Sequence, residues 1–372
     1  MSPIQIAAQP RAPRQIATTT SSSSSTQVWA GVDTHQLTHH VAVIDAAHTQ
    51  LGHAQFPACQ AGYADLVAYV NRFGTVAAYG IESTGSYGAG LTRHLLTQIA
   101  GVEVFEVDRP EKSTRIKHGK SDPVDAYSAA VQVCTGRAVG RAKLTTGAVE
   151  ALRALKVPRD GAVKDRTRAY SQLRDLITTA PGSLKDDLIG LTGKQRAAKA
   201  LAMRPDLTQI NDPVQATKHA MQRLARRIRF LDGEIAVADQ QIHQLTKMLV
   251  PSLLAMRQVG PQTAAQLVIT AGQNIDRMTS EAAFAKLAGV APLPASSGKN
   301  NTRHRLNRGG DRQANAALYL IVVGRMKNHP ETLTYIERRR GEGMSNPEII
   351  RCLKRHLARH IYRALRTDLM TP

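Results

Sequence analysis

Four carboxylates occupy positions where a folded chain could use them for chemistry. Asp33 and Glu82 each end a short apolar run, and polar residues follow each of them. Asp122 and Asp125 are three residues apart, so a helix would carry both on one face. Four acids brought together repel one another, and a hard divalent cation with oxygen ligands, such as Mg²⁺, relieves that repulsion. In a basic protein this set predicts metal-assisted cleavage of phosphodiesters.

The acids also have structural interpretations that remain open from their spacing alone. Asp122-Pro123 is typical of a helix N-cap followed by proline, with Asp125 favouring the helix dipole. Asp33 by itself could be a turn residue. The ordered set of all four acids is what favours the catalytic interpretation.

A serine-containing loop could supply a nucleophile. Ser296 and Ser297 stand in a run rich in proline and small residues, and a serine there could attack a phosphate. The alternative is a solvated basic loop whose serines only form turns. Cations that would neutralise the phosphate and bind nucleic acid follow the serines: Lys299, Arg303, Arg305, Arg308 and Arg312.

Two further patterns are weaker evidence for function than the acids and the serines. Residues 256–267 predict a short helix, a Val-Gly-Pro turn and a second helix, as in a helix-hairpin-helix that binds phosphate through backbone N–H groups. A plain helical hairpin would give the same pattern. We interpret His35, His39 and His40 as surface residues, because no second group of ligands accompanies them.

Composition points to a polyanionic partner. The 372 residues carry 49 Lys and Arg against 29 Asp and Glu, a formal net charge of +20, and this excess favours nucleic acid. The length suggests two or three domains. The three cysteines are far apart, which argues against a disulfide scaffold or a zinc module. No apolar run is long enough for a transmembrane helix, so we expect no membrane partner.

Residues 1–27 form a Ser- and Thr-rich leader, which we expect to be a disordered tail. The elements that must position the acids follow it. Apolar runs then predict strands at 28–33, 40–44, 55–56, 77–82 and 102–107, with helices near 66–70 and 91–99. Three successive strands followed by alternating helix and strand favour an RNase H-like sheet over a doubly wound one. The fold class is therefore α/β followed by α.

The middle of the chain is predicted to be helical. Residues 148–178 show helical spacing that Pro158 and Gly161 interrupt. A cleaner heptad repeat predicts a coiled coil, and with it an oligomer, through Met221, Leu224, Ile228, Leu231, Ile235, Ala238, Ile242, Leu245 and Leu249. The alternative is an amphipathic helix packed inside one domain. Beyond it, residues 299–372 hold sixteen Lys and Arg against six Asp and Glu, which is a segregated basic surface.

The chain resembles the DEDD transposases of the IS110 family of bacterial insertion sequences, which have a RuvC-like N-terminal domain. The resemblance runs from about Trp29 to Leu365 and rests on motifs that occur together in order. These are Gly31-Val32-Asp33, Gly80-Ile81-Glu82-Ser83-Thr84-Gly85, Lys120-Ser121-Asp122-Pro123-Val124-Asp125-Ala126, Val259-Gly260, Leu287-Ala288-Gly289-Val290-Ala291-Pro292, Ser297-Gly298 and Asn307-Arg308-Gly309-Gly310-Asp311-Arg312-Gln313-Ala314-Asn315.

The resemblance implies roles that composition could not give. Asp33, Glu82, Asp122 and Asp125 would be the DEDD tetrad that binds Mg²⁺. Ser297 would attack the DNA phosphodiester and become joined to DNA, although Ser296 adjoins it. Family members also use a non-coding RNA of the element as a guide, and in the family the two halves are thought to meet across subunits.

We therefore predict a transposase that cuts and rejoins DNA in the bacterial cytoplasm, associated with the nucleoid, as a dimer or tetramer. The expected domains are a RuvC-like domain over 28–145, a helical coiled-coil connector over 146–250 and a transposase domain over 251–372. One alternative is a RuvC-like junction resolvase that uses the four acids and water without a serine adduct. Another is a nucleic-acid-binding protein without catalytic activity.

Overall fold

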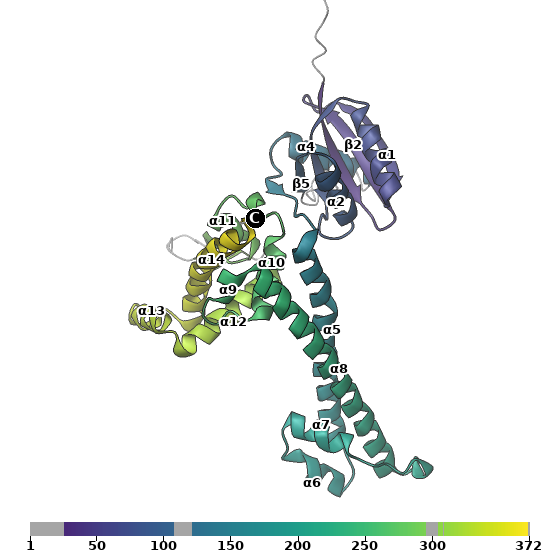
Figure 1. Ribbon diagram of the computed structural model, residues 1–372, viewed down its shortest axis with the longest axis vertical. Helices are drawn as coiled ribbons and strands as arrows, with labels where there is room; N and C mark the ends of the chain where they lie inside the picture. The colour runs from purple at the N-terminus through teal and green to yellow at the C-terminus, as the bar shows by residue number, and fades with distance from the viewer. Residues whose placement is uncertain (1–25, 108–120, 295–303, 308, 371–372) are drawn as a thin grey trace, which may run out of the picture.

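The computed structural model describes residues 26–107, 121–294, 304–307 and 309–370. It consists of an N-terminal α/β unit, a long helical stalk and a C-terminal helical unit that lies beside the upper part of the stalk (Figure 1). Within the described residues, no helix is both long and apolar enough to cross a membrane.

The N-terminal unit is built on a six-stranded sheet in the order β3-β2-β1-β4-β5-β6. Its strands are β1 (Gln27–Thr34), β2 (Thr38–Asp45), β3 (Gln50–Pro57), β4 (Thr75–Glu82), β5 (Val104–Val107) and β6 (Gly140–Arg141). The first three strands pair antiparallel, whereas β4 runs parallel to β1 and β5 runs parallel to β4. This mixed α/β sheet is consistent with the predicted RNase H-like domain.

Helices cover both faces of the sheet. α1 (Gln60–Asn71) and α2 (Ala89–Gln98) share one core cluster with Val28, Ala30 and Val32 of β1. α4 (Asp122–Cys134) packs on the opposite face, where Ala129 and Val133 contact Ala78 of β4. Since side chains alternate along a strand, the Val-x-Ala-x-Val pattern of β1 faces the first two helices and Gly31 faces α4.

The stalk is an intrachain helix pair. α5 (Gly147–Thr178) and α8 (Pro213–Leu249) lie side by side, and α6 (Ser183–Ile189), α7 (Gly193–Leu201) and the 3₁₀ turn η1 (Leu207–Gln209) lie between them in sequence (Figure 1). Two ion pairs of 2.8 Å cross it, Arg159–Asp239 and Arg166–Asp232.

The heptad repeat is accounted for within this pair. Positions of the repeat that are buried on α8 are Met221, Ile228, Leu231, Ile235 and Ile242. The first two pack with residues of α5 and α7, and the next two pack with Ala162 of α5. The repeat therefore has a partner in its own chain, and the oligomer stays a prediction.

The helix predicted over 148–178 is present, and it continues through the interruption of the apolar spacing at Pro158 and Gly161. α5 is one helix of 32 residues with Pro158 inside it. Proline removes one helical hydrogen bond and normally kinks or ends a helix. Here the apolar contacts of the following turns with α8 keep the helix continuous, so packing outweighs local propensity.

The C-terminal unit is mainly helical. It comprises α9 (Pro251–Leu254), α10 (Pro261–Ala271), η2 (Ile275–Arg277), α11 (Glu281–Leu287), β7 (Pro292–Pro294), β8 (His304–Leu306), α12 (Arg312–Asn328), α13 (Pro330–Gly341) and α14 (Asn346–Met370). Its core cluster also includes Val149 and Leu152 of α5. α9 ends at Leu254, before the predicted range of 256–267, and α10 begins at the proline of the Val-Gly-Pro turn. The helix-hairpin-helix and its phosphate binding stay predictions.

Polar contacts join this unit to the end of the N-terminal sheet. The Asn274 side chain accepts a hydrogen bond from the Leu144 N–H over 2.8 Å and donates one to the Ala142 carbonyl over 3.0 Å. Lys143 donates to the Ile269 carbonyl over 3.0 Å. An amide side chain that satisfies both groups of a backbone segment holds that segment as a neighbouring strand would.

Candidate active site

The acidic site is built where α4 crosses two glycines. Gly31 on β1 and Gly80 on β4 are register partners. A Cβ added to Gly31 would lie 2.1 Å from the Ala126 carbonyl oxygen, and one added to Gly80 would lie 2.5 Å from Cγ2 of Val133. Because only glycine leaves room for the helix backbone, these two positions bring the start of α4 to the ends of β1 and β4.

The ends of β1 and β4 are tied together next to the acids. Thr34 donates its hydroxyl hydrogen bond to the Glu82 carbonyl over 2.9 Å. Asp33 is the penultimate residue of β1 and Glu82 the last residue of β4, and the two strands run parallel, so both acids reach the same edge of the sheet. Asp33 is 7% exposed.

The start of α4 supplies the other two acids. Asp122 is the first residue of the helix and its side chain is half-exposed, whereas Asp125, one turn further, is buried. The N-cap is Ser121, so the alternative in which Asp122 caps the helix was wrong by one residue.

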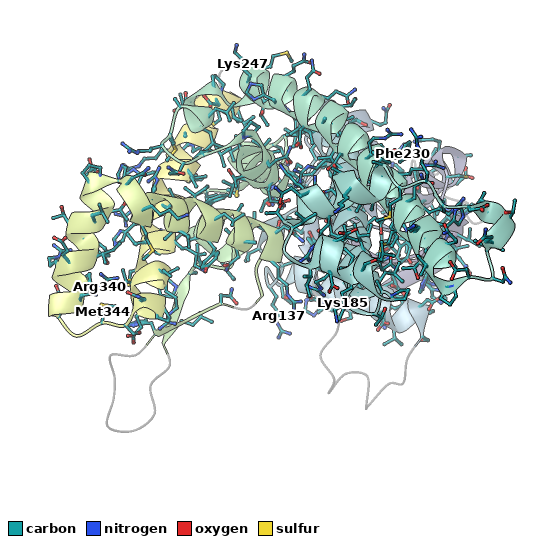
Figure 2. All side chains as sticks on the ribbon, turned by 90° about the horizontal axis from the view of Figure 1, so that it is seen from below. Arg137, Lys185, Phe230, Lys247, Arg340 and Met344 are labelled. Carbon is teal, nitrogen blue, oxygen red and sulfur yellow. The ribbon has the colours of Figure 1, made fainter. Side chains whose placement is uncertain are left out.

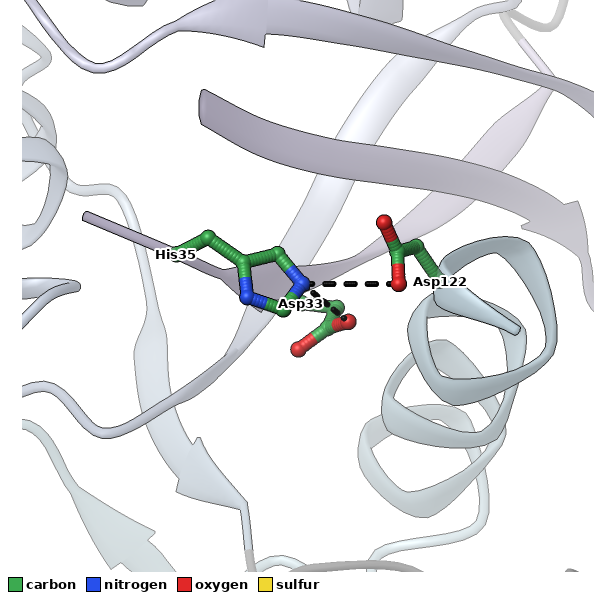
Figure 3. A group of neighbouring side chains, drawn as sticks. All are labelled: Asp33, His35 and Asp122. Carbon is green, nitrogen blue, oxygen red and sulfur yellow. Dashed lines mark ion pairs between the residues drawn. The ribbon is translucent and has the colours of Figure 1, made fainter. Parts of the chain in front are cut away.

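His35 lies between two of these carboxylates (Figure 3). Its Nε2 is 3.2 Å from Oδ2 of Asp33 and 3.4 Å from Oδ1 of Asp122. One oxygen or nitrogen atom from each of the three residues lies within 4.8 Å of the others, which is a spacing that could hold a metal ion. A mixed carboxylate and imidazole set of this kind accepts divalent cations.

The electrostatics of Asp33 show that each of the other three acids lies near it. Burial raises the pKa of the Asp33 carboxyl above its ordinary value, and His35 lowers it. Glu82, Asp125 and Asp122 then raise the pKa of Asp33 further, because a second negative charge nearby disfavours ionisation. Concentrated negative charge at a half-open edge is what a divalent cation would neutralise.

The surface interpretation of the histidines was largely wrong. His39 is fully buried and stacks on Tyr63 with ring centroids 5.6 Å apart, and His40 is 9% exposed. His35 is half-exposed, but it belongs to the acidic cluster. A signal existed: Asp33 and His35 are two residues apart at a strand end, and such residues lie on one face. His40 is the register partner of Asp33 on β2.

The serine region falls partly outside the described residues. Ser296, Ser297, Lys299, Arg303 and Arg308 are among those not described. The segment is bracketed by the antiparallel pair β7 and β8, in which Leu293 pairs with Arg305. Arg312 is the exposed first residue of α12. The structure therefore brings the four acids together and leaves the serine untested.

A compact polar cluster holds the base of that pair. Gly289 and Gly310 touch so closely that a Cβ on Gly310 would lie 2.2 Å from the Gly289 nitrogen. The Asn315 amide donates to the Gly289 carbonyl over 2.8 Å, and buried Lys354 donates to Oδ1 of Asn315 over 2.7 Å. Asp311 caps α12 and accepts a 2.6 Å hydrogen bond from Thr270. These contacts give the Gly-Gly-Asp and Asn residues of the motif at 307–315 a structural role.

Two transposase family models match separate parts of the chain. A family model described as a transposase, for DEDD transposases of the IS110 type, matches residues 30–180. A second, described as transposase of the IS116/IS110/IS902 family, matches residues 251–337. The chain belongs to the IS110 family of transposases.

Two proteins similar to this IS110-family transposase come from insertion elements. It is 25% identical over 387 residues to an uncharacterized 42 kDa protein of insertion element IS900 from Mycobacterium paratuberculosis, covering 91% of this chain and 96% of the relative. It is 34% identical over 145 residues to an uncharacterized 43.6 kDa protein of insertion element IS110 from Streptomyces coelicolor, covering 38% of this chain and 36% of the relative. The chain is thus a DNA transposase, and its acidic cluster lies in the DEDD-type domain.

Proposed function

We propose that this transposase cuts and rejoins DNA to move an insertion sequence, with an acidic tetrad that binds Mg²⁺ and a serine nucleophile. The observation that carries the proposal is the contact of Asp33 and Asp122 with one imidazole, beside Glu82 and Asp125. A bound divalent cation would polarise a scissile phosphate. The donor set fits such a cation, because its carboxylates repel one another and two of them reach a half-exposed edge.

The four acids have different tasks in this proposal. Asp33, held by burial and by the tight contact of α4 with Gly31, is the fixed anchor of the site. Asp122 and Glu82 border it from α4 and β4, and the half-exposed side chain of Asp122 would meet the DNA strand. Asp125, buried on the same helix, adds to the negative charge around Asp33 that a cation would neutralise.

Ser297 is the proposed nucleophile. Its Oγ would bond to phosphorus as the phosphorus–oxygen bond to the departing deoxyribose breaks, so that the hydroxyl proton leaves the serine and the sugar oxygen gains one. The hydroxyl of another strand would then attack the same phosphorus and rejoin DNA, as the phosphorus–oxygen bond to serine breaks and serine regains a proton. Support comes from the family match over residues 251–337 and from the cluster around Gly289 and Gly310 that fixes both arms of the flanking pair.

Nucleic acid is the proposed partner on both units. Lys299, Arg303, Arg305, Arg308 and Arg312 would neutralise phosphates of DNA near the serine. An RNA encoded by the element is the proposed guide, supported by the charge of +20 and by the family resemblance. Such a protein would work in the cytoplasm, on the nucleoid.

An oligomer formed through the stalk is also proposed. The inner face of α8 is occupied by α5, so another subunit would meet its outer face. Phe230, Val237 and Met248 lie there with exposed fractions of 65%, 58% and 72% (Figure 2 labels Phe230). Phe230 and Val237 are seven residues apart, which is one heptad, and exposed apolar side chains at that spacing support a second helical seam.

A covalent-adduct trap tests this function. Protein, Mg²⁺, RNA from the element's flank and end-labelled junction DNA are mixed, denatured and separated on a gel. Wild type should give a labelled protein–DNA adduct that Ser297→Ala abolishes and Ser296→Ala retains. Cleaved DNA without an adduct in any variant would favour the alternative, a RuvC-like junction resolvase that uses water. Cleavage that persists after EDTA has removed all divalent cations would exclude the acidic tetrad from either reaction.

A further inference from the structure

We propose that His35 is a direct nitrogen ligand of the cation in the acidic site and makes that site prefer Mn²⁺ and similar transition-metal ions over Mg²⁺. The proposal rests on the proposed metal-binding function of Asp33 and Asp122. It adds a ligand outside the four carboxylates and assigns the class of metal.

The distances are those of ligands that share one ion. Nε2 of His35 is 3.2 Å from an Asp33 oxygen and 3.4 Å from an Asp122 oxygen. Neighbouring ligands of a small six-coordinate cation stand about 3 Å apart, because bonds of about 2.1 Å meet near right angles. Figure 3 shows one ring nitrogen facing both carboxylates, so a single ion could contact all three side chains after small shifts.

The backbone holds His35 in this place. The residue follows directly after β1, and its N–H donates to the Thr38 carbonyl over 3.0 Å, which closes the turn into β2. Because side chains alternate between the two faces of a strand, Asp33 and His35, two residues apart, lie on the same side. The imidazole therefore reaches the site from a short, hydrogen-bonded turn, whereas Asp122 reaches it from α4.

The position is also open enough for an ion to enter. The side chains of His35 and Asp122 are 47% and 46% exposed, while that of Asp33 is 9% exposed. One buried carboxylate thus forms the floor of the site and two half-exposed groups form its rim. Such a rim leaves room for water or a phosphate oxygen to complete the coordination.

The chemistry of the donors sets the choice of metal. Carboxylates and water suit Mg²⁺, Ca²⁺ and Mn²⁺, whereas imidazole suits transition metals. Mg²⁺ usually binds through one or two carboxylates together with water and phosphate, and it gains little from a nitrogen. Mn²⁺ accepts both donor types, so His35 strengthens its binding selectively.

Pulsed electron paramagnetic resonance of bound Mn²⁺ tests the ligand directly. In full-length wild type, Mn²⁺ should show the hyperfine coupling of a directly bonded imidazole nitrogen. The coupling should be lost in His35→Gln, and it should persist in His53→Gln, which changes an exposed imidazole on β3 of the same sheet. Bound Mn²⁺ without nitrogen coupling in wild type, or with coupling that survives in His35→Gln, would overturn the proposal and leave the tetrad intact. Wild type that binds no Mn²⁺ at all would overturn the metal centre itself.

Competition between the two ions tests the preference. Mn²⁺ affinity, followed by the loss of the free-ion signal, should fall at least about tenfold in His35→Gln. The Mg²⁺ concentration that displaces half of the bound Mn²⁺ should fall in parallel, since glutamine offers oxygen in place of nitrogen. An unchanged ratio of the two affinities would show that His35 only hydrogen-bonds to the carboxylates.

Discussion

Gly31 on β1 and Gly80 on β4 are register partners, and α4 crosses the sheet directly over both. Ala126 and Ala130 approach the first glycine, while Val133 and Ala129 approach the second. The small residues on both sides let the helix backbone lie close to the strands. This contact sets where the first turn of α4 meets the strand ends, and so it sets the separation of Asp33 from Asp122.

Gly31→Ala should therefore disturb the acidic site. The new Cβ would lie 2.1 Å from a backbone oxygen, so α4 must move, at a cost of about 1–3 kcal/mol or more. We expect a lower melting temperature and loss of cleavage. Gly233→Ala on α8 is the matched control: a Cβ there meets no described atom within 4 Å, and alanine favours the helix. Equal stability of both variants would contradict the close contact.

Asp33→Asn should abolish strand transfer but stabilise the metal-free protein at neutral pH. The raised pKa of Asp33 means that its charged form costs folding free energy, and asparagine removes that charge. The gain in melting temperature, measured with EDTA, should be present at neutral pH. It should shrink as the pH falls through the folded-state pKa and vanish below the ordinary value of 3.8. Loss of the folded state by circular dichroism would instead make the position structural.

His39 should make the fold sensitive to mild acid. Burial lowers its pKa, and its Nε2 has no hydrogen-bond partner among the described residues. The unfolded chain therefore takes up a proton that the fold resists, and stability should fall as the pH drops below the ordinary value of 6.5. His39→Phe, which retains the ring against Tyr63, should show a smaller drop in melting temperature between pH 7.5 and 5.5. A drop equal to that of wild type would remove His39 as a cause.

Arg312→Glu should weaken DNA binding at every sequence. Arg312 is exposed at the start of α12, next to the serine region. Loss of one phosphate contact should reduce the slope of log affinity against log salt by about one unit. Fluorescence anisotropy over a salt series measures this, with Lys194→Glu on α7 at the far end of the stalk as the charge-matched control. An unchanged slope would take Arg312 out of the interface.

Lys354→Met should destabilise the polar cluster at the base of the β7–β8 pair. The variant leaves Oδ1 of Asn315 without its buried donor, which typically costs about 1–3 kcal/mol. Chemical denaturation should detect this, and adduct formation should slow because the Asn315–Gly289 contact loses its support. Arg363→Met, an exposed position on the same helix, should change neither quantity. If Lys354→Met is destabilised but forms the adduct at the wild-type rate, then Lys354 contributes to folding stability and not to the reaction.

The strands and the order of the acids were accessible from the sequence. The predicted strands at 28–33, 40–44 and 77–82 correspond to β1, β2 and β4, and the acids at the ends of the first and fourth do share one sheet edge. Alternation of apolar residues is a local property, so each strand was visible without its partners. The predicted order of three successive strands followed by alternating helix and strand agrees with the element order from β1 to β5, and the mixed sheet is consistent with the predicted RNase H-like domain.

Tertiary structure alone decided which groups meet. The heptad repeat of α8 was plain in the sequence, but its partner, α5, lies in the same chain because the intervening helices turn the chain back. His35 joined the acids, and His39 became buried, through a helix and strands distant in sequence. A periodic pattern specifies which face of an element is covered; the partner that covers it is chosen by the packing of the whole chain.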